Sequence, residues 1–146
     1  MNFRWEYDQE NISWSELEKM YLAVPLGSKS AEDLKLVFTN SLYKCFVYHD
    51  DKLIAAGRAL ADGMDCSYLA DIGVLPYYQG LGLGRAIVKK LVEFSAGYRK
   101  IILYANPGKE TFYAKLGFDK LQTGMAIFKH RDKMLANGTI SEFKNQ

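Results

Sequence analysis

The sequence predicts an α/β domain with a mixed, mostly antiparallel central sheet and about four flanking helices. An apolar run at residues 68–76 leads into a glycine-rich segment at 79–84 and then into an amphipathic segment from Arg85, so strand, loop and helix follow one another. Two β-rich runs, residues 43–49 and 53–60, flank Asp-Asp-Lys and predict an antiparallel hairpin. The crossover through the helix predicts that the strands on either side of it are parallel.

The first half of the chain contains a strand, two helices and the hairpin. Residues 3–7 alternate aromatic and charged side chains, a pattern typical of a half-buried strand. Ser13 and Glu16 have the spacing of a capping box, which predicts a helix to about residue 22. A second helix is predicted over residues 31–40, because Leu34, Val37 and Phe38 share one helical face.

The second half continues with the strand before the glycine loop, a helix to residue 94 and a buried strand at 100–105. A short helix over 109–116 should end at Gly117. Residues 118–121 and 125–128 are expected to close the sheet as a final hairpin. The polar segment from residue 130 onward is expected to fray.

Length and composition favour one globular domain over residues 1–146. Apolar residues make up 49% and charged residues 25% of the chain, and the formal net charge is +2. No strongly basic patch indicates a nucleic-acid partner, and no segment is long and apolar enough for a membrane span. No signal peptide is visible, so a cytoplasmic protein is expected. Cys45 and Cys66 are interpreted as small buried thiols.

The glycine-rich loop predicts a phosphate site. Backbone N–H groups at a helix N-terminus have no intrahelical partner, and the helix dipole is positive there. The spacing Gly80-x-Gly82-x-Gly84 differs from the dinucleotide fingerprint, which disfavours an NAD-dependent oxidoreductase, and no P-loop Gly-Lys-Ser/Thr follows. A tight turn without a ligand is the alternative interpretation of the glycines alone.

Two motifs in the second half resemble those of the GCN5-related N-acetyltransferase (GNAT) superfamily. Val74-Leu-Pro76 followed by Gln79-x-x-Gly82-x-Gly84 resembles the acetyl-CoA motif of that family. The run from Asn106 to Phe118, which ends in Phe-Tyr-Ala-Lys-Leu-Gly-Phe, is similar to its second signature. The resemblance is strong over about residues 65–128 and extends to residues 1–60 only in pattern. Lys109 departs from the small residue that many relatives carry, which leaves the local shape near the cofactor's tail undefined.

The resemblance implies acetyl-CoA as co-substrate, bound between two splayed parallel strands, and no metal. Backbone groups of Ile72 and Val74 would pair with the pantetheine arm, and the loop N–H groups would hold the pyrophosphate. Arg85 could add charge near the phosphates or face solvent, and Asn106 could contact pantetheine or only end a strand. The residues expected to bind the cofactor are Ile72, Val74, Gln79, Gly80, Leu81, Gly82, Leu83, Gly84, Arg85, Asn106 and Tyr113.

The resemblance also implies direct attack of an amine on the thioester, with Tyr113 as the general acid for the departing thiolate. A phenol with a reference pKa near 10 is protonated at neutral pH and can donate, although a core aromatic is the alternative role. Asp71 is a carboxylate in an otherwise apolar strand, where it could bind or deprotonate the amine. A structural carboxylate is the equal alternative for Asp71.

The acceptor is expected to be the primary amine of a small molecule, an arylalkylamine or a polyamine-like amine. Its site is expected in the substrate-side half, about residues 1–60 and mainly 14–40, together with the final hairpin. Trp5, Tyr7, Trp14 and Tyr21 could form aromatic walls or simply belong to the core. A protein amine as acceptor, and a non-catalytic acyl-CoA sensor on the same fold, remain open. A homodimer is compatible with the sequence because edge strands of this fold often pair.

Overall fold

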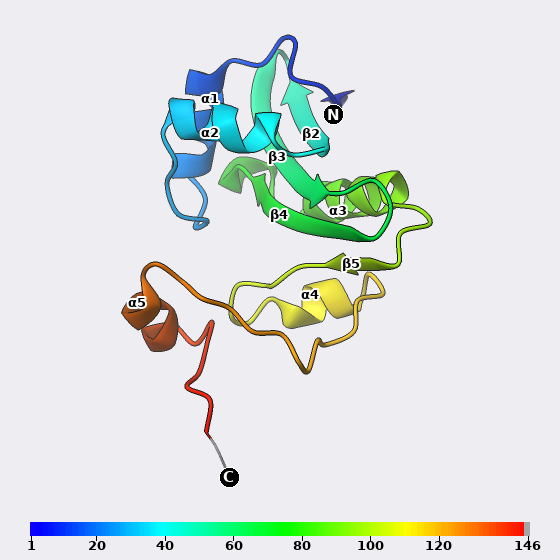
Figure 1. Cartoon of the computed structure of the whole chain (residues 1–146). Coiled ribbons are helices and arrows are strands. Elements are labelled where there is room, and N and C mark those ends of the chain that lie inside the picture. Colours follow the sequence, from blue (N-terminus) through cyan, green and yellow to red (C-terminus); the bar gives the residue numbers. More distant parts are fainter. Residues whose placement is uncertain (145–146) are drawn as a thin grey trace. The chain divides into compact units, whose positions relative to one another are not determined.

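The computed structural model describes residues 1–144, and these residues fall into two compact units (Figure 1). The first unit, Met1–Leu103, contains all strands of the described chain and the three longest helices. The second unit begins at Tyr104 and contains two short helices. The sheet and the glycine loop therefore both belong to the first unit, whereas the second signature motif lies in the second unit.

A five-stranded sheet forms the centre of the first unit. Its strands are β1 (Arg4–Glu6), β2 (Tyr43–His49), β3 (Lys52–Ala61), β4 (Cys66–Val74) and β5 (Lys100–Ile102). They lie in the order β1-β2-β3-β4-β5, with antiparallel pairing up to β4 and parallel pairing between β4 and β5. The predicted mixed, mostly antiparallel sheet is confirmed. The strand expected over residues 100–105 is shorter, because its pairing ends at Ile102.

Two helices cover one face of the sheet. Helix α1 (Trp14–Leu22) begins after Ser13, whose hydroxyl accepts a hydrogen bond from the Glu16 N–H at 3.3 Å, the first half of the predicted capping box. The Glu16 carboxylate accepts instead from the Leu53 N–H at 3.2 Å. Helix α2 (Ala31–Thr39) is capped in the same way by the serine that precedes it. The core on this face consists of buried side chains from both helices, from the turn after α1 and from β2 and β3: Leu17, Met20, Tyr21, Val24, Leu34, Phe38, Phe46, Tyr48, Leu53 and Ala56.

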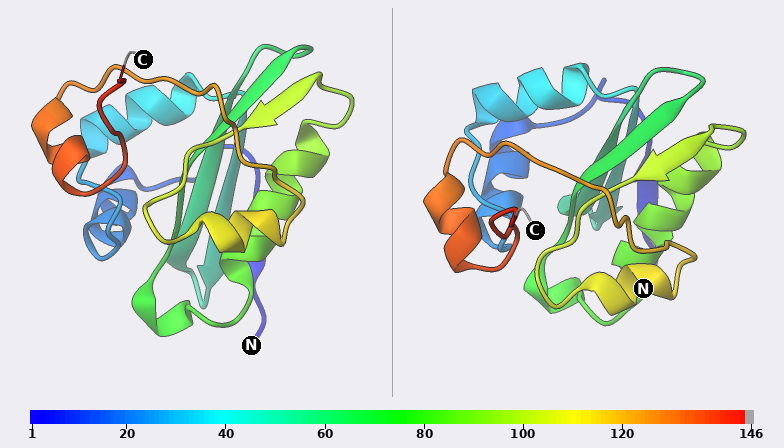
Figure 2. Two further views of the ribbon diagram at one scale, coloured as in Figure 1. Left: turned by 90° about the horizontal axis from the view of Figure 1, so that it is seen from below. Right: turned by 60° about the horizontal axis from the view of Figure 1, so that its bottom comes forward.

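The amphipathic helix α3 (Leu83–Phe94) covers the opposite face (Figure 2). Its buried residues Leu83, Ile87, Val88 and Leu91 recur at helical spacing. Gly57 of β3 makes the close approach of this helix to the sheet possible. A Cβ on Gly57 would lie 2.7 Å from the Ile87 Cγ2 atom, so even alanine would collide there.

A β-bulge interrupts the pairing of β3 with β4 next to Asp71. Ala56 pairs with Gly73 and Arg58 pairs with Ala70, so two residues of β4 lie opposite Gly57 alone. Asp71 has a φ of 55°, in the left-handed region that aspartate and asparagine tolerate better than most residues. The bulge changes the alternation of side chains and directs Asp71 toward the face covered by α1 and α2.

The second unit differs from the sequence prediction in two places. It contains α4 (Glu110–Ala114) and α5 (Arg131–Ala136), and no strand is formed between residues 104 and 144. The predicted final hairpin over 118–121 and 125–128 is therefore wrong. Met125 and Ile127 are 80% and 102% exposed, so burial does not stabilise strands at that position.

The tail from residue 130 forms a short helix where fraying was expected. Lys133, Met134, Leu135 and Ala136 are good helix formers, and Gly138 at φ 84° lets the chain turn after the helix. Within residues 1–144, no helix has the length and apolar character that crossing a membrane requires.

Candidate active site

The glycine loop connects β4 to α3 through a single 3-10 turn, η1 (Pro76–Tyr78). Gly80 and Gly82 both have a φ of 82°, a conformation that strains any L side chain. No atom lies within 4 Å of the position where either glycine would carry a Cβ, so the loop backbone is open to an approaching group. Gly84 lies in the first turn of α3.

The N-terminus of α3 is left without a side-chain cap. Its N-cap residue is Gly82, its first turn contains no acidic residue, and the first helical hydrogen bond runs from the Ala86 N–H to the Gly82 carbonyl. The N–H groups of residues 83–85 therefore precede the helical ladder, as an anion site requires. The side chain of Leu83 is buried, so only its backbone can face a ligand, whereas Leu81 and Arg85 are exposed.

Gln79 fastens the loop to the end of β4. Its side-chain amide donates to the Val74 carbonyl at 3.0 Å. The 3-10 turn is held as well, because Tyr78 is buried and its hydroxyl lies 2.8 Å from the His49 Nδ1 atom. Gln79 thus has a structural partner within the cofactor motif, and its predicted contact with the cofactor stays a prediction.

The edge of β4 that leads to the loop has no strand partner beyond its first residues. Strand β5 pairs only with Cys66, Ser67 and Tyr68, although β4 continues to Val74. No strand in residues 1–144 pairs with β4 on this side past Tyr68. Ile72 and Val74 lie in this unpaired stretch, and the loop backbone beyond it is open, so both places where the pantetheine arm and the pyrophosphate are predicted to bind are uncovered by a neighbouring strand.

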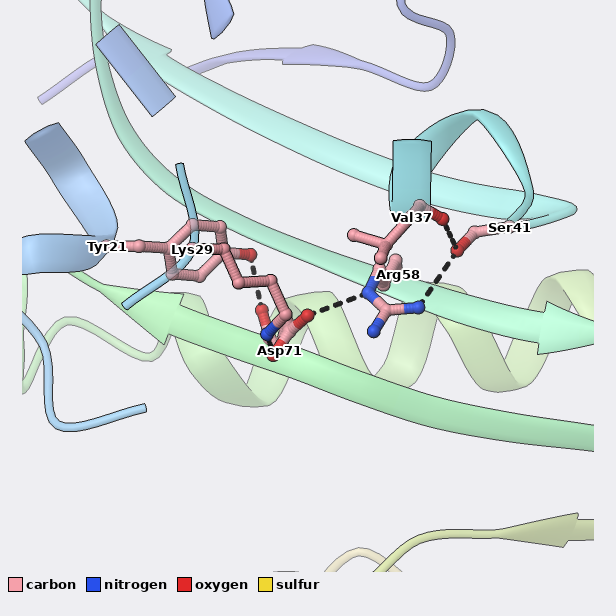
Figure 3. Close-up of polar contacts among 6 residues, drawn as sticks. All are labelled: Tyr21, Lys29, Val37, Ser41, Arg58 and Asp71. Carbon is pink, nitrogen blue, oxygen red and sulfur yellow. Dashed lines mark hydrogen bonds and ion pairs between the residues drawn. The ribbon is translucent and has the colours of Figure 1, made fainter. Parts of the chain in front are cut away.

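Asp71 lies in a network of ion pairs on the α1–α2 side of the sheet (Figure 3). The Arg58 Nε atom donates to Asp71 Oδ2 at 2.7 Å, and the Lys29 Nζ atom donates to Asp71 Oδ1 at 3.2 Å. The Arg58 Nη1 atom also donates to the Ser41 Oγ atom at 3.2 Å. The side chains of Arg58 and Asp71 are only 10% and 13% exposed, whereas that of Lys29 is 32% exposed.

The backbone of Asp71 is held by a second contact. The Tyr21 hydroxyl donates to the Asp71 carbonyl oxygen at 2.5 Å. Burial, and then the nearby Asp71 carboxylate, raise the pKa of Tyr21 well above its usual value, so the phenol keeps its proton and remains a donor. A small depression beside this contact is lined by Tyr21, Leu26, Gly27, Lys29, Leu34 and Asp71.

The second signature motif lies in the second unit. Asn106 is exposed in a turn, where its carbonyl accepts a hydrogen bond from the Lys109 N–H at 2.9 Å. Tyr113 lies in α4 with its ring next to Phe112 and Phe118. Burial raises the pKa of Tyr113 above its ordinary value, so its phenol is protonated at neutral pH, the state that a proton donor needs.

The first unit thus combines an open strand edge with an uncapped, glycine-rich helix N-terminus. This arrangement defines a protein that can hold an extended ligand bearing phosphate groups. The family described as "Acetyltransferase (GNAT) family" matches residues 5–118, and the chain belongs to this family. It is an N-acetyltransferase of the GNAT type, an enzyme class that takes its acetyl group from acetyl-CoA.

Individual proteins show how far the similarity reaches. An uncharacterized N-acetyltransferase, ycf52 of Pyropia yezoensis, is 30% identical over 80% of this chain and 70% of its own length. Serotonin N-acetyltransferase 2 of Oryza sativa, a chloroplastic protein, is 39% identical over 56% of this chain and 43% of its own. A probable acetyltransferase from meticillin-resistant Staphylococcus aureus superposes with a TM-score of 0.75 at 24% identity and covers 87% of this chain and 99% of its own.

Sequence reasoning identified Asp71 but missed its partners. Arg58 carries a usable signal, because it is the one charged residue among small and apolar residues in Ile54–Leu60 of a buried strand. A buried charge of this kind predicts an oppositely charged partner. Lys29 and Ser41 carry no such signal, since both lie in polar connecting segments.

Proposed function

We propose that this protein transfers the acetyl group of acetyl-CoA to the primary amine of a small molecule, with Asp71 holding the amine. The observation that carries the proposal is the Asp71 carboxylate at the edge of a depression with apolar walls, on the strand whose free edge leads to the glycine loop. Acetyl-CoA supplies an activated acetyl thioester when it is bound. Leu26, which is partly exposed, supplies an apolar contact, and Asp71 supplies the negative charge for an ammonium group.

The residues of the chain then have separate tasks. Arg58 and Tyr21 fix Asp71, so the carboxylate meets the acceptor in one orientation, and orientation by itself can supply much of a rate enhancement. The amine must lose a proton before it attacks, and Asp71 is proposed to accept that proton, directly or through water. Tyr113 is proposed to protonate the departing thiolate, since its phenol keeps its proton at neutral pH.

An arylalkylamine is the proposed acceptor class. Asp71 places a carboxylate next to the partly exposed apolar side chain of Leu26, a pairing that suits a cation with an apolar body. The similarity to the rice serotonin N-acetyltransferase supports this class. A protein amine is the alternative, and an N-terminal peptide or a lysine peptide in the same assay would distinguish the two.

The first experiment titrates the protein calorimetrically with acetyl-CoA, CoA and NAD. We expect binding of both CoA compounds and none of NAD. Turnover is then followed by thiol release with 2-phenylethylamine, tryptamine, spermidine and a lysine peptide. Acetyl-CoA binding without turnover of any amine would favour the sensor interpretation, and no acetyl-CoA binding would contradict both.

Tyr113→Phe tests the acid. We expect kcat to fall about 10²-fold or more, a larger loss than that of acetyl-CoA affinity, because the phenol gives up its proton only in the reaction itself. Tyr104→Phe is the matched control, because Tyr104 lies in the same unit and is 54% exposed. Full turnover in Tyr113→Phe would show that the thiolate leaves without this proton.

Asp71→Asn tests the amine site, because asparagine also tolerates the left-handed conformation of this position. A binding role predicts a higher KM for the amine. A role as base predicts, in addition, a lower kcat and loss of the acidic limb of the pH–rate profile. Unchanged kinetics would leave Asp71 with a structural role only.

A further inference from the structure

Lys29 places a primary ammonium group on the carboxylate to which the acceptor amine is assigned. Its Nζ atom lies 3.2 Å from Asp71 Oδ1. Lys29 belongs to the segment between α1 and α2, and its side chain helps to line the depression next to Asp71. Chemically, the end of its side chain is an alkylammonium ion, the same group as a protonated acceptor (Figure 3).

The two oxygens of Asp71 are held in different ways. Oδ2 faces Arg58, which is buried and is itself fixed by Ser41, whose hydroxyl donates to the Val37 carbonyl at 2.7 Å. Oδ1 faces Lys29, which is more exposed and sits at a longer distance. A lysine ammonium is a hydrated point charge on a flexible stem and makes one contact here, so it is the more easily replaced partner.

Asp71 stays in place when Lys29 leaves. Arg58 holds Oδ2, and the Tyr21 hydroxyl holds the backbone carbonyl, both independently of Lys29. Replacing one ammonium by another at Oδ1 preserves the charge balance of the network. The exchange therefore requires movement of a lysine side chain and leaves the strand unchanged.

We propose that Lys29 is a tethered competitor of the acceptor, bound to Asp71 until a substrate ammonium displaces it. The inference rests on the proposed function, since it takes Asp71 as the amine site. It makes Lys29 a specificity-determining residue, because an acceptor must bind Asp71 better than a lysine that is always present. A weak amine then fails to displace Lys29, whereas an amine with an apolar body can gain contact with Leu26, the partly exposed apolar side chain beside Asp71.

The competition has a measurable size. A protein whose binding-competent state is only partly populated binds its ligand more weakly by that fraction. For an ion pair of ordinary strength, removal of the competitor should lower the apparent KM of the amine by about two- to tenfold. The kcat should stay unchanged, because Lys29 no longer contacts Asp71 Oδ1 once the amine is bound there.

The kinetic test compares Lys29→Met with wild type, using acetyl-CoA and 2-phenylethylamine. We expect a lower KM in Lys29→Met and an equal or higher KM in Lys29→Arg, because arginine keeps the charge and can bind a carboxylate through two donors. Lys19→Met is the matched control for the loss of one positive charge, since Lys19 is exposed on α1, and it should leave KM unchanged. An unchanged or higher KM in Lys29→Met would overturn the proposal.

A labelling test needs no turnover. Saturating 2-phenylethylamine, without acetyl-CoA, should increase the labelling of Lys29 relative to that of Lys19 by an amine-reactive acetylating reagent. The ratio is the measured quantity, because free 2-phenylethylamine also consumes the reagent and slows both reactions equally. An unchanged ratio under calorimetrically confirmed amine saturation would also overturn the proposal. Failure of the proposed function gives a different result, because wild type would then turn over no amine at all. Failure of the Lys29 proposal alone leaves wild-type turnover intact and changes only the comparison between wild type and Lys29→Met.

Discussion

Arg58→Met should lower the stability of the protein substantially by leaving the Asp71 carboxylate without its buried partner. Arg58 and Asp71 have side chains that are 10% and 13% exposed, and 2.7 Å separates Nε from Oδ2. Breaking a fully buried pair costs about 3–5 kcal/mol, because one charge remains uncompensated. Lys29 still contacts Asp71, so we expect the lower end of this range, about 3 kcal/mol.

Urea unfolding, followed by circular dichroism, measures this loss. About 3 kcal/mol is a large part of the roughly 5–15 kcal/mol that stabilises a typical domain, and it should lower the thermal midpoint by roughly 10 °C. The control is Lys100→Met, which removes the pair with Asp65, where the side chains are 53% and 39% exposed. An exposed pair of this kind should contribute far less than the buried pair, because water screens its charges.

The double variant Arg58→Met/Asp71→Asn separates the ion pair from the packing of the arginine side chain. Once the carboxylate has become an amide, loss of the guanidinium leaves no buried charge unpaired. The two substitutions should therefore be non-additive by about 2 kcal/mol or more, as residues in direct contact usually are. Additive effects, or a cost below about 1 kcal/mol for Arg58→Met, would refute the reasoning.

Three further changes test the fold around the site. Gly57→Ala should cost about 1–3 kcal/mol in urea unfolding, because its Cβ would lie 2.7 Å from Ile87 Cγ2, and a cost near zero would show that α3 shifts freely. With a thiol reagent at pH 8, half-buried Cys66 should react well before buried Cys45, and equal rates in the folded protein would contradict this order. Burial raises the pKa of Cys45 from 9.0 to about 12. Between these two pH values the native state keeps the thiol proton, whereas the unfolded chain loses it. The stability of wild type relative to Cys45→Ala should therefore be constant below about pH 9 and decline toward pH 12, and a constant difference would count against this pKa.

The elements of the first unit follow from short-range signals that the sequence carries openly. The Ser13 cap begins α1, and the β-rich runs on either side of residues 50–52 form the β2–β3 hairpin. The glycine segment places α3 after β4. Each of these signals depends on neighbours within a few residues, so one sequence is enough to interpret them.

The second unit shows where such signals fail. Residues 125–128 have the composition of a strand, but a strand of a two-stranded pair needs a covered face, and the exposure of Ile127 shows that none is provided there. The composition of a short segment therefore cannot decide whether it forms a strand. Burial of the segment depends on whether residues far away in the sequence pack against it.

Asp71 has one feature that the local sequence predicts and others that depend on distant residues. That a carboxylate in an apolar strand needs a partner or a task follows from the sequence alone. In the structure its side chain and that of Ile72 lie on opposite faces, since Asp71 contacts Arg58 and Lys29 whereas the Ile72 Cγ1 atom lies by Gly57, toward α3. Its partners lie 13 and 42 residues away, and the bulge with its left-handed φ decides which of the two faces it reaches. Because aspartate tolerates this backbone conformation, the same residue can both form the bulge and present the charge. Asp71→Asn therefore keeps the bulge and removes only the charge, whereas Asp71→Ala should add a backbone cost of about 1 kcal/mol, and equal unfolding free energies of the two variants would show that the bulge does not depend on this residue.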